Sequence, residues 1–276
     1  MKKSLRMPLV AAMAAAAMVL SACASGSTTE ETMTEEDSAL MTPGVLVVGM
    51  NLQYKPQMYL EGDEPTGYDV ELLNALADDM GVELEIKNLD FAGLIPGLQA
   101  QQFDMVSVGL SATDERKEVI DFSRGYVPYS SILAVPEGES TSLTIDELNQ
   151  EGVIITALQG SSNEQLIRDN FPNATVQGFP DQNAALLEVA TGRAAAVVVE
   201  DYILAQFDTA NPGQLAQAEV DGPLSLYYGA WGVQKGNSAL VEQLDEFLCT
   251  VQNDGTMADL YTSIMAPTMP EMPAGC

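Results

Sequence analysis

The chain has no histidine and few basic residues, and both shortages narrow what the protein can do. Its 276 residues include 11 lysines and arginines against 40 aspartates and glutamates, which gives a formal net charge of −29. Nucleic acids and anionic lipid headgroups are therefore poor partners, since both are bound mainly through clustered basic side chains. Because the chain has no histidine and its three cysteines show no metal-ligand spacing, a zinc site is excluded. The lack of histidine also excludes a histidine-based catalytic triad. No cofactor is expected.

Long apolar runs are also missing, with one exception at the N-terminus. Three basic residues precede an uncharged run rich in Ala, Met and Leu: Lys2, Lys3 and Arg6. This pattern is typical of a secretory signal, and the run is too short for a comfortable transmembrane helix. It ends in Leu20-Ser21-Ala22-Cys23, which resembles a bacterial lipobox. We therefore predict a signal peptide over 1–22 and lipidation of Cys23, which would anchor the protein outside the cell membrane.

The segment 23–43 is rich in Ser, Thr and Glu and lacks aromatic residues. Because it cannot bury enough apolar surface to offset the entropy of ordering, it is predicted to be a disordered acidic tether. If Cys23 carries lipid, Cys249 and Cys276 remain. In an oxidising exterior these two could form one disulfide that closes the C-terminal tail, and two unpaired thiols are the alternative.

Alternating strand and helix patterns predict an α/β fold. The first unit begins with a buried strand at 45–49 and continues through a helix that ends at Gly81 to strands at 82–86 and 103–108. A second unit begins with a strand at 153–156 and includes another at 194–199. Repeated β-α-β order predicts mainly parallel sheets with helices on both faces. Two such units followed by a C-terminal return predict two lobes with a cleft between them.

The stretch 109–116 follows a predicted buried strand and has a composition that suits a carboxylate. Gly109 allows close approach of the backbone, Ser111 offers a hydroxyl, and Arg116 offers two parallel N–H donors. A strand-to-helix turn with a capping Thr113 and a surface arginine fits the local pattern equally well.

Two further positions are predicted to face the cleft. Ser161 and Glu164 have the spacing of a capping box, and the N–H groups at such a helix start favour an anion. Glu200 and Asp201 follow a predicted parallel strand, at the edge where open α/β sheets bind ligands.

Several stretches, in order, resemble the bacterial extracellular solute-binding proteins of family 3, the polar amino-acid receptors of ABC importers. They are Gly67 to Leu72, Phe91 to Leu98, Gly109 to Lys117, Asp121-Phe122-Ser123, Gln159 to Ser162 and Lys235-Gly236-Asn237. The similarity covers roughly 44–265 and implies a two-lobed periplasmic-binding-protein-like fold of type II, with two mainly parallel sheets, flanking helices and a ligand cleft between the lobes.

The resemblance also implies that the chain crosses between the lobes near 132–135 and 223–227. Lobe 1 is then 44–133 plus 225–265, lobe 2 is 134–224, and a C-terminal tail follows at 266–276. The implied function is that of a monomeric, non-enzymatic receptor that delivers a polar amino acid to the membrane subunits of an ABC permease. A dehydratase-like periplasmic enzyme, with Glu200 and Asp201 as an acid/base pair, and a ligand-sensing ectodomain are the alternatives.

By resemblance, Arg116 matches the family arginine that binds the ligand α-carboxylate. The backbone N–H of Ser111 would assist it, together with the helix start at Ser161 and Ser162 from the other lobe. The Gly109 carbonyl and the Ser111 hydroxyl match acceptors for the α-ammonium group. Glu200 stands where the family usually has an aspartate for that ammonium. Strand alternation favours Glu200 over its neighbour Asp201, which remains the alternative.

The ligand side chain is expected to contact two aromatic residues, Tyr54 and Phe91. Asn51 stands where receptors for cationic amino acids in this family often carry an aspartate, and Gln57 stands where they often carry an aromatic residue. Both are amides here, which favours a glutamine- or asparagine-like ligand. A compatible solute or an opine remains an alternative ligand.

Overall fold

The computed structural model describes residues 39–220, 223–273 and 276. The predicted signal peptide, the lipidation site Cys23 and the tether up to residue 38 lie outside the described residues. No helix in the described part has the length and apolar character needed to cross a bilayer. Leu40 is buried, and the Met41 N–H donates to Asp104 Oδ1 over 2.6 Å. The predicted disordered tether therefore does not reach residue 43.

The first lobe is built on three parallel strands joined by helices. These are β1 (Val45–Met50), α1 (Tyr68–Met80), β5 (Glu83–Asn88), α2 (Phe91–Gln99) and β6 (Met105–Ser111). Helix α1 ends as the sequence predicts, because Gly81 adopts the left-handed conformation with φ 66°. Strand β6 runs further than predicted, so Gly109 and Ser111 belong to the strand and not to a loop. A small antiparallel sheet precedes α1: β2 (Gln53–Tyr54), β3 (Met58–Glu61) and β4 (Glu64–Thr66).

The second lobe repeats this arrangement. Strand β8 (Ile154–Leu158) pairs in parallel with β9 (Thr175–Phe179) on one side and with β10 (Ala196–Glu200) on the other. The main helices of this lobe are α5 (Ser162–Asn170), α6 (Gln182–Ala190) and α7 (Asp201–Ala210). Smaller elements complete it: a 3₁₀ turn at Glu137–Glu139, α4 (Ile145–Leu148) and β11 (Leu215–Gln217).

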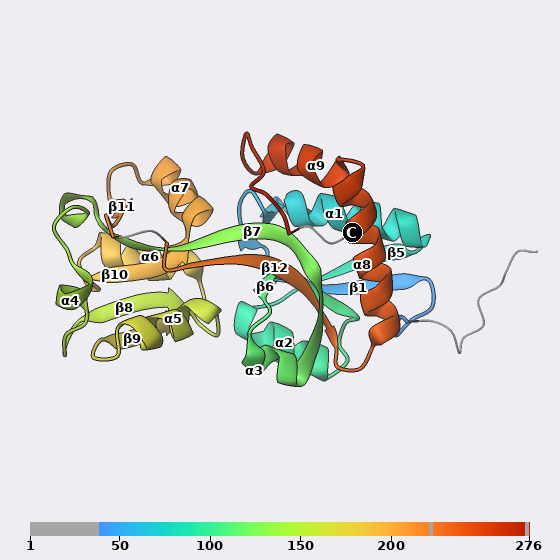
Figure 1. Cartoon of the computed structure of the whole chain (residues 1–276), viewed down its shortest axis with the longest axis horizontal. Helices are drawn as coiled ribbons and strands as arrows, with labels where there is room; N and C mark the ends of the chain where they lie inside the picture. The colour runs from blue at the N-terminus through green and yellow to red at the C-terminus, as the bar shows by residue number, and fades with distance from the viewer. Residues whose placement is uncertain (1–38, 221–222, 274–275) are drawn as a thin grey trace, which may run out of the picture. The chain divides into compact units, whose positions relative to one another are not determined.

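Two long antiparallel strands connect the lobes, β7 (Ile120–Pro136) and β12 (Ser225–Gln234). Figure 1 shows them running side by side between the two groups of elements. Strand β12 pairs with β6 of the first lobe, and β7 pairs with β10 of the second. The two predicted sheets are therefore continuous, with the order β5-β1-β6-β12-β7-β10-β8-β9 and β11 paired to β7.

The C-terminal helices return to the first lobe. Helix α8 (Ser238–Asn253) buries Leu240, Leu244 and Leu248 at helical spacing, and α9 (Thr256–Ile264) follows. Cys249 and Cys276 form a disulfide, with their Cα atoms 5.3 Å apart, so the tail is fastened to α8. The buried apolar residues form two clusters. The larger includes Trp231 and Tyr68, whereas the smaller lies within the second lobe around Ile155 and Phe171.

Candidate functional site

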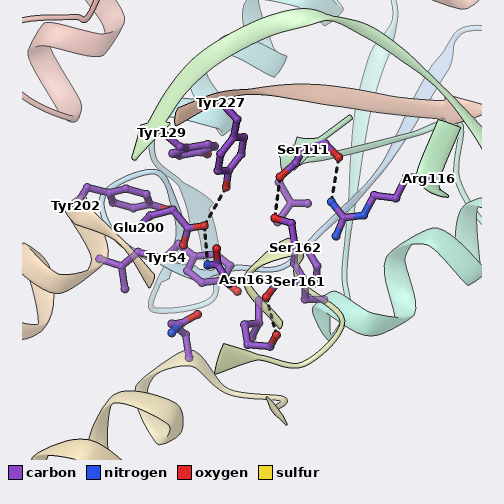
Figure 2. A pocket seen from close by; sticks show the side chains of 15 residues that line it. Tyr54, Ser111, Arg116, Tyr129, Ser161, Ser162, Asn163, Glu200, Tyr202 and Tyr227 are labelled. Atoms are coloured by element: carbon purple, nitrogen blue, oxygen red, sulfur yellow. Dashed lines mark hydrogen bonds between the residues drawn. The ribbon is translucent and has the colours of Figure 1, made fainter. Parts of the chain in front are cut away.

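A pocket is lined by residues from both lobes and from the connecting strands (Figure 2). The first lobe and the connecting strands contribute Tyr54, Phe91, Val108, Ser111, Arg116, Tyr129 and Tyr227. The second lobe contributes Leu158, Ser161, Ser162, Asn163, Gln182, Glu200, Tyr202 and Ile203. The structure thus brings together seven of the predicted site residues: Tyr54, Phe91, Ser111, Arg116, Ser161, Ser162 and Glu200.

Arg116 lies at one end of the pocket on α3 (Asp114–Val119), a short helix whose N-cap is Thr113. The side chain is buried, so the alternative of a surface arginine is wrong. Its Nη1 donates to the Ser111 carbonyl and its Nη2 to the Gly160 carbonyl, each over 3.1 Å, and the second bond joins the lobes. The guanidinium carbon lies 5.7 Å from the centre of the Phe91 ring. Burial lowers the pKa of this guanidinium, which nevertheless stays protonated at neutral pH.

The serines beside Arg116 add a second contact between the lobes. The hydroxyls of Ser111 and Ser162 lie 2.9 Å apart. The predicted capping box at Ser161 is wrong, because the Ser161 hydroxyl donates to the Leu158 carbonyl over 2.7 Å. Glu164 instead accepts from the Gly160 N–H over 3.1 Å. The N–H groups in the first turn of α5 have no acceptor within the helix, so they can serve an anion in the pocket.

Glu200 lies at the opposite end of the pocket, as Figure 2 shows, where β10 gives way to α7. Its Oε1 accepts from the Tyr227 hydroxyl over 2.9 Å and from Asn163 Nδ2 over 3.1 Å. Burial raises the pKa of this carboxyl group above its ordinary value, and the hydrogen bonds from Tyr227 and Asn163 oppose the rise. The neighbouring Asp201 is exposed and borders a different pocket.

Three tyrosines around Glu200 were not found by sequence reasoning. Tyr129 comes from β7, Tyr202 from α7 and Tyr227 from β12. The Tyr129 ring centre lies 5.8 Å from that of Tyr202 and 5.1 Å from that of Tyr227. These residues occupy three elements that meet only in the folded chain, so no local motif marks them.

Two polar groups that line the pocket are buried without a hydrogen-bond partner among the described residues. They are the Tyr54 hydroxyl and the Gln182 side-chain nitrogen. A buried polar atom without a partner costs free energy. Their position makes them suited to bind a polar ligand group.

Three residues from the sequence prediction do not line this pocket. Gln57 is fully buried and donates to Asp69 Oδ1 over 2.9 Å, so its prediction as a ligand-selecting residue is wrong. Asn51 borders a separate surface pocket and donates to the Leu89 carbonyl over 2.6 Å. Gly109 has a φ of 62° and is not among the residues that line the pocket, and a side chain there would overlap the Tyr129 hydroxyl.

Comparison with known proteins identifies what this arrangement resembles. The family model of bacterial extracellular solute-binding proteins, family 3, matches residues 46–266. The "Probable amino-acid-binding protein YxeM" of Bacillus subtilis (strain 168) is 31% identical over 197 residues, which cover 71% of this chain and 70% of the relative.

Two solved structures show the same fold. The substrate binding protein of an amino acid ABC transporter is 29% identical, with a TM-score of 0.72, and the match covers 80% of this chain and 98% of that one. An ancestral arginine-binding protein bound to glutamine has the same identity, TM-score and coverage. The predicted type II periplasmic-binding-protein fold is confirmed.

Proposed function

The chain belongs to the bacterial extracellular solute-binding proteins of family 3, and from that membership we propose that it clamps an amino acid between its lobes and delivers it to the membrane subunits of an ABC importer. One observation carries the proposal: a single pocket holds Arg116 at one end and Glu200 at the other. This separation of opposite charges suits the carboxylate and ammonium groups of a free amino acid.

Arg116, with Ser111, Ser161 and Ser162, would bind the α-carboxylate. The α-ammonium would donate to Glu200, whose Oε1 accepts from the side chains of Tyr227 and Asn163. The Ser111 hydroxyl, which lines the pocket, is the further acceptor assigned to the ammonium group, whereas Gly109 does not line the pocket.

A ligand held this way touches both lobes and stabilises the closed arrangement in which they meet. The permease would recognise that closed arrangement. The two parts that would move relative to each other are lobe 1, 44–133 plus 225–265, and lobe 2, 134–224.

The charges in the pocket favour a ligand with a neutral side chain. Arg116 and Glu200 are the only charged residues that line it in the described part of the chain. A zwitterion would occupy both, so a cationic side chain would be buried without a partner, at considerable cost. Tyr54 and Gln182 offer hydrogen bonds to a neutral polar group, and Tyr54 and Phe91 offer apolar surface. We therefore favour an amide such as glutamine over a compatible solute or an opine.

A thermal-shift screen over the twenty amino acids, common osmolytes and opines tests the binding function, because a compound that binds only the folded protein raises its melting temperature. Calorimetry on Arg116→Ala should then show no binding of the selected amino acid. Arg168→Ala is the matched control, since this exposed arginine pairs with Glu164 outside the pocket. Undiminished affinity in Arg116→Ala would contradict the proposal.

The site of action follows from Cys23, which would carry lipid and hold a monomeric receptor at the outer face of the membrane. Cys23→Ser should move the protein from the membrane fraction to the soluble fraction. If the variant stays with the membrane, the anchor is wrong, and the binding function is unaffected by that result.

A dehydratase-like enzyme is the second candidate, and the environment of Glu200 favours it. Burial raises the pKa of this carboxyl group, which would help it to donate a proton as a general acid. Asp201 cannot form the other half of a pair in this pocket, because it borders a different one. Mass spectrometry of the selected amino acid after long incubation separates the candidates: an unaltered compound supports a receptor, and a product supports an enzyme.

A further inference from the structure

The core of the first lobe contains a buried carboxylate that the pocket does not use. Asp69, at the start of α1, has no exposed surface. Its Oδ1 accepts from Gln57 Nε2 over 2.9 Å. Its Oδ2 accepts from the Ser107 hydroxyl over 2.8 Å and from the Tyr126 hydroxyl over 2.5 Å. Three side chains from a loop and two strands therefore donate to this one group.

The same network reaches the strand that forms the pocket wall. The Tyr126 hydroxyl accepts from the Gly109 N–H over 2.9 Å. A hydroxyl has one proton, and an ionised carboxylate can only accept, so Tyr126 must give that proton to Asp69 and turn its lone pairs toward Gly109. Two residues further on, the Ser111 carbonyl accepts from Arg116.

We propose that Asp69 is a positioning residue for the ligand pocket: in its ionised form it orients the Tyr126 hydroxyl, which holds the backbone at Gly109 and so places Ser111 and Arg116. This inference rests on the proposed amino-acid site. It assigns Asp69 no contact with the ligand, since Asp69 is not among the residues that line the pocket.

Among the described residues of this network, Asp69 is the group whose pKa lies closest to neutral pH. The titratable groups that interact with it are Tyr68, Tyr126, Tyr129 and Tyr202, from α1, β7 and α7. Burial raises the pKa of each of these tyrosines, so all remain neutral. Burial also raises the pKa of Asp69 to about 6, against the opposing hydrogen bonds from Tyr126, Gln57 and Ser107. In mild acid Asp69 becomes a donor, and the Tyr126 hydroxyl is free to turn away from Gly109.

The chain contains its own optical probe of this event. Trp231 is the only tryptophan, is fully buried, and donates through Nε1 to the Ser107 hydroxyl over 2.9 Å. Its ring centre lies 5.1 Å from that of Tyr126. Tryptophan fluorescence should therefore follow the protonation of Asp69 without any ligand present.

Two variants separate a positioning role from a structural one. The probe is L-glutamine, or whichever of the twenty amino acids gives the larger thermal shift. Wild type should show a fluorescence titration with its midpoint near pH 6, and its affinity should fall about tenfold between pH 7 and pH 5. Asp69→Asn should lose the titration and bind about tenfold more weakly at pH 7.

Tyr126→Phe removes the hydrogen bonds that the Tyr126 hydroxyl makes with Gly109 and with Asp69, while Gln57 and Ser107 still donate to Asp69. It should keep the fluorescence titration, lose affinity to the same extent, and lose the pH dependence that Asp69 adds to binding. Combining both substitutions should weaken binding no further than either alone. Tyr228→Phe is the matched control, since its hydroxyl donates to the Glu271 carbonyl away from the pocket, and it should bind as wild type does.

Wild-type affinity in Tyr126→Phe, or a surviving titration in Asp69→Asn, overturns the inference. If wild type binds no amino acid, the proposed function fails while the inference is still decided by hydrogen exchange at the Gly109 amide. Exchange there should be faster in Asp69→Asn than in wild type, and an unchanged rate overturns the link.

Discussion

The two lobes hold their buried carboxylates in different ways. Asp69 lies in the core of the first lobe, where three protein side chains donate to both of its oxygens. Glu200 lies at the pocket edge of the second lobe, where two side chains donate to its Oε1. A carboxylate can accept about four hydrogen bonds, so the protein replaces water more completely around Asp69. Asp69 therefore holds elements of the first lobe together, whereas Glu200 lines the pocket and can contact a bound ligand.

The largest effect is expected where the first lobe is most tightly constrained. Gly109→Ala would place a methyl group against the ring and hydroxyl of Tyr129, at a φ of 62°. Strain and overlap together should lower the free energy of unfolding by about 4 kcal/mol, measured by urea denaturation. Gly192→Ala in the second lobe has a similar φ of 73° and no neighbour within 4 Å. It should cost about 1 kcal/mol, and equal losses at both positions would show that overlap does not matter.

The next largest effect tests whether Glu200 is the acid that faces the ligand. Glu200→Gln keeps an acceptor for Tyr227 and Asn163 but removes the negative charge. Calorimetry with the selected amino acid should show binding about 100-fold weaker. Asp201→Asn is the control on the adjacent residue, which borders another pocket, and its affinity should be unchanged. The opposite result would assign the ammonium group to Asp201.

A smaller effect is expected in how the free energy of unfolding depends on pH, because Asp69 titrates between pH 4 and pH 7. Burial raises the pKa of Asp69 from 3.8 to about 6, so the folded protein holds this proton more tightly than the unfolded chain does. That stability is present below pH 3.8 and is lost as pH rises through 6. Between pH 4 and pH 7 wild type should lose about 2 kcal/mol relative to Asp69→Asn. Urea denaturation at both pH values measures this loss of stability. Any contribution from Glu200 cancels in the comparison, because wild type and Asp69→Asn both contain this residue. Parallel pH curves for the two proteins would contradict the shift.

The smallest effect is expected for a charge pair on the surface of the second lobe. Arg193 donates through Nε and Nη2 to the two oxygens of Glu188, each over 2.8 Å, and the arginine is exposed. Solvent screens such a pair, so Arg193→Ala should leave the urea midpoint nearly unchanged. A loss comparable to that of Gly109→Ala would mean that surface charges, rather than buried groups, distinguish the lobes.

Local signals in the sequence predicted the elements that depend on neighbours along the chain. Helix α1 and its end at Gly81 follow from apolar spacing and a left-handed glycine. The grouping of Ser111 with Arg116 on one side of the pocket follows from their separation by five residues between a strand and a short helix.

Long-range contacts could not be predicted in this way. The burial of Gln57 against Asp69 depends on a contact between a loop and α1 that has no periodic signature. Tyr129 lies on β7, which is 17 residues long because it pairs with β12 and then with β10 in turn. Ser161 has the spacing of a capping residue, yet its hydroxyl finds the nearer Leu158 carbonyl.

The paired strands β7 and β12 also limit how the lobes can move. From Ser131 opposite Ser225 to Pro128 opposite Tyr228, the two strands run antiparallel in unbroken register. Sliding one strand along the other would break several interstrand hydrogen bonds together, whereas bending the pair across its thin direction breaks none. The pair of strands β7 and β12 therefore bends more easily in this direction than in any other. The closing of the lobes proposed above would therefore follow this one bending direction.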